Sequence, residues 1–121
     1  MNVRFWPLAD INLVIYKMNL VSEKTKELVE KFYPTDSETV VLQLQDYCDY
    51  LSEIFGDKAL PENYERFCFA VLKLGESSKE KLNKAVELGK IDYRDLLVSA
   101  GFANSLTIHN EWADKILDLS E

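Results

Sequence analysis

Helical periodicity runs through nearly all of the chain after Val21, and this feature constrains the fold more than any other. Apolar residues recur at every third or fourth position, which places them along one side of an α-helix. The chain has only four glycines and three prolines, too few for the many tight turns of a β-sandwich or β-barrel. The sequence therefore predicts an all-α fold.

Capping residues and helix breakers divide this pattern into short helices. Helices are predicted over residues 22–33, 38–55, 62–74, 92–100 and 108–117, and another begins at the capping-box spacing of Ser77 and Glu80. The helix over 62–74 carries apolar residues on most of its sides, which indicates that several neighbours bury it. In the helix that follows, Gly89 has no side chain, and this permits a close approach between two helices.

The first segment of the chain is less regular. Residues 8–18 keep helical spacing, yet the run from Ile11 to Tyr16 is rich in β-branched and aromatic residues and also fits a short strand. No linker, repeat or low-complexity stretch divides the 121 residues. We expect a single helical domain over residues 1–121, an orthogonal bundle of six or seven short helices in which a short N-terminal strand is the alternative.

The charge of the chain narrows the classes of partner. It carries 21 acidic and 14 basic residues, a net charge of −7. Nucleic acids and anionic membrane surfaces attract basic proteins, so we expect neither as a partner, whereas a basic protein is the class that this charge attracts. The N-terminus lacks the pattern of a secretory signal, and no apolar run approaches the ~20 residues of a membrane-spanning helix. We therefore expect a cytoplasmic protein.

The sequence contains no motif for nucleotide, phosphate or zinc chemistry, and we expect neither a cofactor nor a metal. A disulfide between Cys48 and Cys68 is possible if their helices pack together, but the favoured interpretation is a pair of buried, reduced thiols. His109 is the only histidine, and helical spacing places no serine or cysteine within reach of its imidazole ring. We predict that it is a partly exposed surface residue. An enzyme is not expected.

Asp92, Arg94 and Asp95 form the densest charged group in the chain. Asp92 is placed to cap backbone N–H groups, and Asp95 falls in the first turn of a helix, where acids are favourable. Arg94 can pair with Glu87 or with Asp95 across the joint between two helices. We predict a buried or half-buried structural clamp here rather than a catalytic group.

The strongest candidate for function is a run of acids without basic neighbours. Six acids and no Lys or Arg occur between Lys31 and Lys58. Four of them gather on the side of the helix over 38–55 that is opposite its apolar face, with a leucine and a tyrosine beside them. One interpretation is a solvated surface, and the other is a docking face on which acids steer a basic partner and apolar side chains anchor it. The predicted partner-binding residues are Leu42, Asp46, Asp49, Tyr50, Glu53 and Asp57.

The segment 66–102 carries three short patterns. They are R-x3-AVLKL at 66–74, KL-x2-AVE at 81–87 and DYRDLL at 92–97, followed by AGF at 100–102. This segment resembles small bacterial helical proteins of unassigned role. The resemblance implies a bacterial or phage origin, and no function comes with it.

Two functions remain as hypotheses. The first is an acidic helical module that binds a basic protein, most concretely an inhibitor or immunity protein that masks a toxin or nuclease. The alternative is a structural or regulatory module that homodimerises or joins a larger assembly through an apolar helix face, on the helix over 62–74 or on the N-terminal segment. The first hypothesis predicts a monomer, and the second predicts a weak homodimer.

Overall fold

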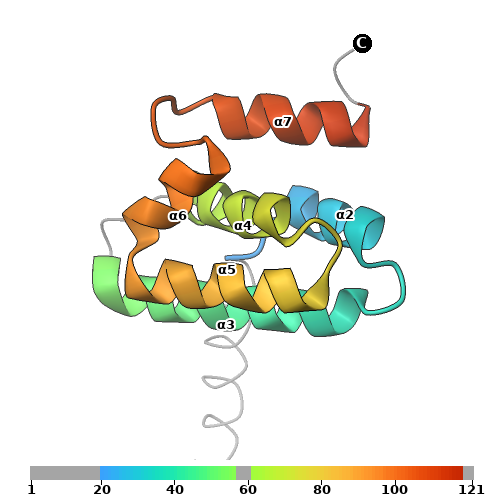
Figure 1. Ribbon diagram of the computed structural model, residues 1–121, viewed down its shortest axis with the longest axis horizontal. Helices are drawn as coiled ribbons and strands as arrows, with labels where there is room; N and C mark the ends of the chain where they lie inside the picture. Colours follow the sequence, from blue (N-terminus) through green and yellow to red (C-terminus); the bar gives the residue numbers. More distant parts are fainter. Residues whose placement is uncertain (1–19, 57–60, 119–121) are drawn as a thin grey trace, which may run out of the picture.

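The computed structural model describes residues 20–56 and 61–118, and Figure 1 shows how their helices are arranged. Every regular element in these two ranges is a helix, which confirms the all-α prediction. Residues 8–18, for which helix and strand were both considered, lie outside them. No helix in the described ranges is long and apolar enough to cross a membrane. The elements are α2 (Glu23–Phe32), α3 (Ser37–Phe55), α4 (Pro61–Gly75), α5 (Lys79–Ile91), α6 (Tyr93–Ala100) and α7 (Ile108–Leu117).

Several helix ends follow from capping residues that the sequence predicts. Ser22 Oγ accepts a hydrogen bond of 3.1 Å from the backbone N–H of Thr25 and caps α2. Gly101 ends α6 in a left-handed conformation with φ 82°, where a side chain would be strained. One predicted cap is wrong by a residue, because Ser78 has the extended backbone of an N-cap and caps α5, whereas Ser77 is left-handed with φ 65°.

α4 lies at the centre of the described helices, as its apolar pattern predicts. It packs against α2, α3, α5, α6 and α7, and in Figure 1 it lies between α7 on one side and the neighbouring pair α3 and α5 on the other. Phe69 and Leu72 lie off its main apolar stripe and are fully buried all the same. The hydrophobic residues that α4 contributes to the core are Tyr64, Phe67, Cys68, Phe69, Ala70, Val71 and Leu72.

The two cysteines meet where α3 packs on α4. Their Sγ atoms are 3.5 Å apart, and both are free, fully buried thiols. The contact with the Cys48 thiol and the burial of the site raise the pKa of Cys68. A thiol with a raised pKa holds little of the reactive thiolate at neutral pH, so Cys68 serves here as a small core side chain.

Gly89 brings α5 into close contact with α3. A Cβ atom built on Gly89 would lie 2.6 Å from Cζ of Tyr47 and 3.0 Å from a methyl carbon of Leu96. Tyr47 is completely buried, so its ring has little room to move away. The predicted close approach of two helices at Gly89 is confirmed.

His109 is buried, and the prediction of a surface residue is wrong. It is 2% exposed, and its ring centroid lies 5.7 Å from that of Phe69 and 6.2 Å from that of Phe102. Neither ring nitrogen has a hydrogen-bond partner among the described residues. The aromatic rings around His109 come from α4 and from the loop before α7, and local spacing does not reveal such neighbours.

Burial is the main cause that lowers the pKa of His109. Among the nearby charges, Glu65 raises this pKa, whereas Arg66 and Lys24 lower it. Below about pH 6.5 the folded protein therefore binds a proton at His109 less readily than the unfolded chain does. The stability that this site contributes is present above that pH and is lost as the pH falls.

We expect Gly89→Ala to destabilise the protein, although alanine is the better helix former by about 1 kcal/mol. Overpacking against Tyr47 is expected to lower the free energy of unfolding by about 1–3 kcal/mol. Urea denaturation measures the change, and Lys84→Ala, at an exposed position of the same helix, is the control. An unchanged or raised free energy of unfolding in Gly89→Ala would mean that α3 and α5 do not pack this closely.

We expect the free energy of unfolding to fall as the pH is lowered through about 6.5, the ordinary pKa of histidine in the unfolded chain, because the folded protein binds the proton at His109 less readily. Urea denaturation at several pH values measures this decrease. His109→Phe is the control, because it keeps an aromatic ring in the site and removes the titrating group. If the wild-type protein and the variant lose stability in parallel, the burial of His109 is not the cause.

Candidate partner-binding surface

The outward side of α3 carries most of the residues predicted to bind a partner. Leu42 is 63% exposed and Tyr50 is 36% exposed, and Asp46 and Glu53 are exposed as well. Asp49 is half-buried, and Asp57 lies outside the described residues. Four of the six predicted residues are therefore accessible on one helix, and together they form the outer face of α3: Leu42, Asp46, Tyr50 and Glu53.

Two residues of the outer face contact Lys90 near the end of α5. Asp46 Oδ2 lies 3.4 Å from Lys90 Nζ, and Tyr50 Oη donates a hydrogen bond of 2.8 Å to the carbonyl oxygen of Lys90. The ammonium group lies 5.7 Å from the centroid of the Tyr50 ring. α3 has no basic residue of its own, but α5 supplies one because it runs beside α3 (Figure 1). Asp46 and Tyr50 thus also hold α5 against α3.

Glu53 differs from Asp46, because no described basic residue pairs with it. It lies in the last turn of α3, where the partial negative charge of a helix C-terminus disfavours a carboxylate by about 0.3–1 kcal/mol. None of the ion pairs among the described residues includes it. Ile54 beside it is 49% exposed, because it lies at the edge of the apolar side of α3. An exposed apolar residue therefore accompanies an acid that forms no ion pair with the described residues.

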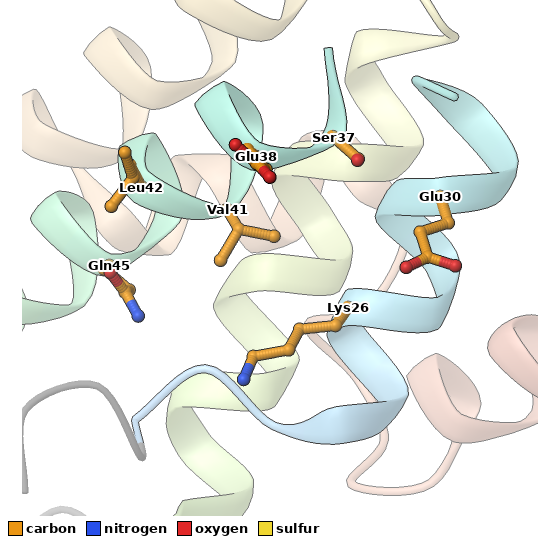
Figure 2. A pocket seen from close by; sticks show the side chains of 7 residues that line it. All are labelled: Lys26, Glu30, Ser37, Glu38, Val41, Leu42 and Gln45. Carbon is orange, nitrogen blue, oxygen red and sulfur yellow. The ribbon is translucent and has the colours of Figure 1, made fainter. Parts of the chain in front are cut away.

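A groove of about 380 Å³ lies between α2 and α3, next to Leu42 (Figure 2). Val41 points into it from α3, and Lys26 and Glu30 reach toward it from α2. Glu38 stands on the wall opposite Glu30. The sequence does not reveal this groove, because its shape depends on how α2 packs against α3. The lining residues are Lys26, Glu30, Ser37, Glu38, Val41, Leu42 and Gln45.

A second cavity, of about 500 Å³, lies near the C-terminal end of α3. Phe55, Phe67 and Tyr93 line it, and their ring centroids are 5.0–5.8 Å apart. Arg66 is the charged residue in its lining, and its guanidinium group donates hydrogen bonds to backbone carbonyl oxygens at residues 102, 103 and 105. Arg66 therefore holds the loop between α6 and α7, and we assign the second cavity no ligand.

Asp92 caps α6 as predicted, but the predicted ion pair of Arg94 is not formed. Asp92 Oδ1 accepts hydrogen bonds from the backbone N–H groups of Arg94 and Asp95 at 3.1 and 3.2 Å. Arg94 is exposed and lies 5.9 Å from the centroid of the Tyr93 ring, and no ion pair of the described residues includes it. The predicted clamp is therefore wrong, and the group acts as a helix cap at Asp92. Arg94 does not lie on the buried side of α6, so its side chain points away from the joint between the helices.

We expect Asp92→Ala to lower the free energy of unfolding by about 1 kcal/mol, since two backbone N–H groups lose their acceptor. Arg94→Ala is expected to change it by less than about 0.5 kcal/mol, as surface substitutions do. Thermal denaturation of both variants checks the difference. A larger loss of stability in Arg94→Ala than in Asp92→Ala would show that Arg94 does form the predicted clamp.

The outer face of α3 and the groove beside it are the candidate site that the geometry offers. In the described part of the chain, no group of three or more His, Cys, Asp and Glu side chains is arranged to hold a metal ion. Comparisons of the chain with protein-family models, with curated proteins and with solved structures find no match.

Proposed function

We propose that the protein is an acidic helical module that binds a positively charged protein through the outer face of α3. The most concrete form is an inhibitor or immunity protein that masks a basic toxin or nuclease. The observation that carries the proposal is Glu53, an exposed acid at the unfavourable end of a helix without basic residues, beside the exposed Ile54. A positively charged partner removes this unfavourable interaction when it binds.

Net charge and local contacts act at different distances. The net charge of −7 attracts a basic partner over about a Debye length, or about 8 Å at physiological salt. At contact, Asp46 and Glu53 are accessible to basic side chains, and Leu42 and Tyr50 supply apolar surface that loses water. The acids speed association, and the apolar residues slow dissociation.

Lys90 pairs with Asp46 in the free protein and would be replaced there by a basic side chain of the partner. Its ion pair with Asp46 is long, at 3.4 Å, and the two side chains are 37% and 76% exposed. Exposed pairs of this kind contribute about 0–1 kcal/mol, so a cation of the partner can replace Lys90 at Asp46 with little loss. Tyr50 keeps its hydrogen bond to the backbone of α5, and its ring is thereby held in place for a partner.

The alternative function is self-association through an apolar helix face, and a different observation favours it. Ile91 at the end of α5 is 84% exposed, and Val98 on α6 is 62% exposed. The apolar residues of α4, which the sequence suggests for such a contact, are buried by the other helices, and the N-terminal segment lies outside the described residues. Analytical ultracentrifugation separates the two functions, since a dimer that grows with concentration supports self-association and a monomer supports the proposal.

The proposal predicts that removing two charges from the outer face slows the binding of the partner. The partner is captured from the source cells and purified, and its binding kinetics are measured at low and high salt. Asp46→Asn combined with Glu53→Gln is expected to lower the association rate about tenfold or more at low salt and to weaken its salt dependence. Stability is expected to stay within about 0.5 kcal/mol, because the loss of the Lys90 pair and the relief of repulsion are both small.

The matched control is Asp95→Asn combined with Glu111→Gln. It removes the same charge from exposed positions on α6 and α7, and neither residue belongs to the outer face of α3 or to the groove lining. Equal slowing in both double variants would show that net charge alone steers the partner. An unchanged association rate in Asp46→Asn with Glu53→Gln would reject the outer face as the docking site.

A further inference from the structure

The groove between α2 and α3 combines an apolar base with acids on both walls. Val41 is half-buried and points into the groove, and Leu42 is 63% exposed at its edge. Glu30 on α2 and Glu38 on α3 are both exposed and stand on opposite sides (Figure 2). A group that fits this groove presents apolar atoms to its base and positive charge to its rim.

We propose that the groove receives one lysine or arginine side chain of the basic partner, an inference that rests on the binding function proposed above. The methylene groups of this side chain pack on Val41 and Leu42, as long basic side chains do on apolar surfaces. Its charged head lies between Glu30 and Glu38, whose carboxylates accept charge-assisted hydrogen bonds.

Arginine suits the lining better than lysine does. A guanidinium group presents five N–H donors in a planar fork, and it is more weakly hydrated than an ammonium group. The walls offer two carboxylates, and Ser37 and Gln45 add a hydroxyl oxygen and an amide oxygen that can accept further hydrogen bonds. Several acceptors that come from different directions match the several donors of arginine.

Glu30 and Glu38 occupy opposite ends of their helices. Glu38 lies in the first turn of α3, where the helix dipole favours a carboxylate, and Glu30 lies in the last turn of α2, where the dipole disfavours one. Neither takes part in an ion pair among the described residues. A bound cation therefore gains a well-placed acceptor at Glu38. At Glu30 it offsets the unfavourable interaction between the carboxylate and the helix dipole.

Lys26 is the basic residue among the seven that line the groove, and its charge is already paired. Its Nζ atom lies 3.2 Å from Glu23 Oε2, one turn away on α2. An acidic side chain in the groove would face the two carboxylates of the walls. A purely apolar segment would take these carboxylates out of water without giving them a partner. Charge complementarity thus selects a basic side chain.

The test uses N-acetyl-L-arginine amide as a probe and follows the backbone amide signals of the full chain by NMR. Saturable shifts are expected at Glu38, Val41 and Leu42. N-acetyl-L-citrulline amide has nearly the same shape and no charge, and it is expected to bind about tenfold more weakly, because a charged hydrogen bond is replaced by a neutral one. Equal affinity for the two probes would overturn the inference.

Two double variants distinguish binding in the groove from general attraction between the negative protein and the positive probe. Glu30→Gln combined with Glu38→Gln is expected to weaken the arginine probe about tenfold or more. Asp95→Asn combined with Glu111→Gln removes the same charge from residues that do not line the groove and is expected to leave the affinity unchanged. An equal loss in both double variants, or shifts spread over helices away from the groove, would overturn the inference.

Binding to the purified partner distinguishes a failure of this inference from a failure of the proposed function. Weaker binding by Glu30→Gln with Glu38→Gln, beyond that of the matched control, supports the groove. Unchanged binding by that variant together with weaker binding by Asp46→Asn with Glu53→Gln rejects the groove and leaves the outer face in place. Unchanged binding by both rejects the groove and the proposed function together.

Discussion

α4 is packed against five other helices, and each of them must give it an apolar stripe. This requirement fixes which side of every neighbouring helix is turned inward. For α3 the inward side holds Leu44, Tyr47 and Leu51, so Asp46 and Glu53 are directed outward. The close approach at Gly89 then sets α5 directly beside α3, which brings Lys90 to the outer face. The candidate surface is thus a consequence of how α4 is buried.

The helices and the core were largely predictable from the sequence, because both follow from spacing within one segment. The central place of α4 follows from its apolar residues on most sides, and the accessibility of Leu42 and Glu53 follows from the opposite side of one helix. Contacts between distant segments were not predictable. The rings that bury His109 come from two other segments, although its spacing from Trp112, Ala113 and Ile116 already places it on the inward stripe of α7.

For the candidate site, too, the sequence predicted the exposed side of one helix but not the contacts between helices. Spacing places Asp46 and Tyr50 on the exposed side of α3, yet it does not show that Lys90 meets both. Nor does it show that α2 and α3 leave a groove between them, since residues from two helices must be placed relative to each other. One signal was available in the sequence for Glu53: an acid three residues before a glycine that ends a helix lies at the unfavourable end of the helix dipole.

Glu30 and Glu53 share this unfavourable position, in the last turns of α2 and α3. Each loses about 0.3–1 kcal/mol there, a small amount beside the 5–15 kcal/mol that typically holds a domain folded. Stability alone favours basic residues at such positions, and α2, α4 and α5 do have Lys31, Lys73 and Lys90 in their last turns. One of the two acids borders the groove, and the other lies on the outer face of α3. A basic partner that covers α3 would meet both, so a single electrostatic explanation accounts for the two acids that the fold itself does not favour.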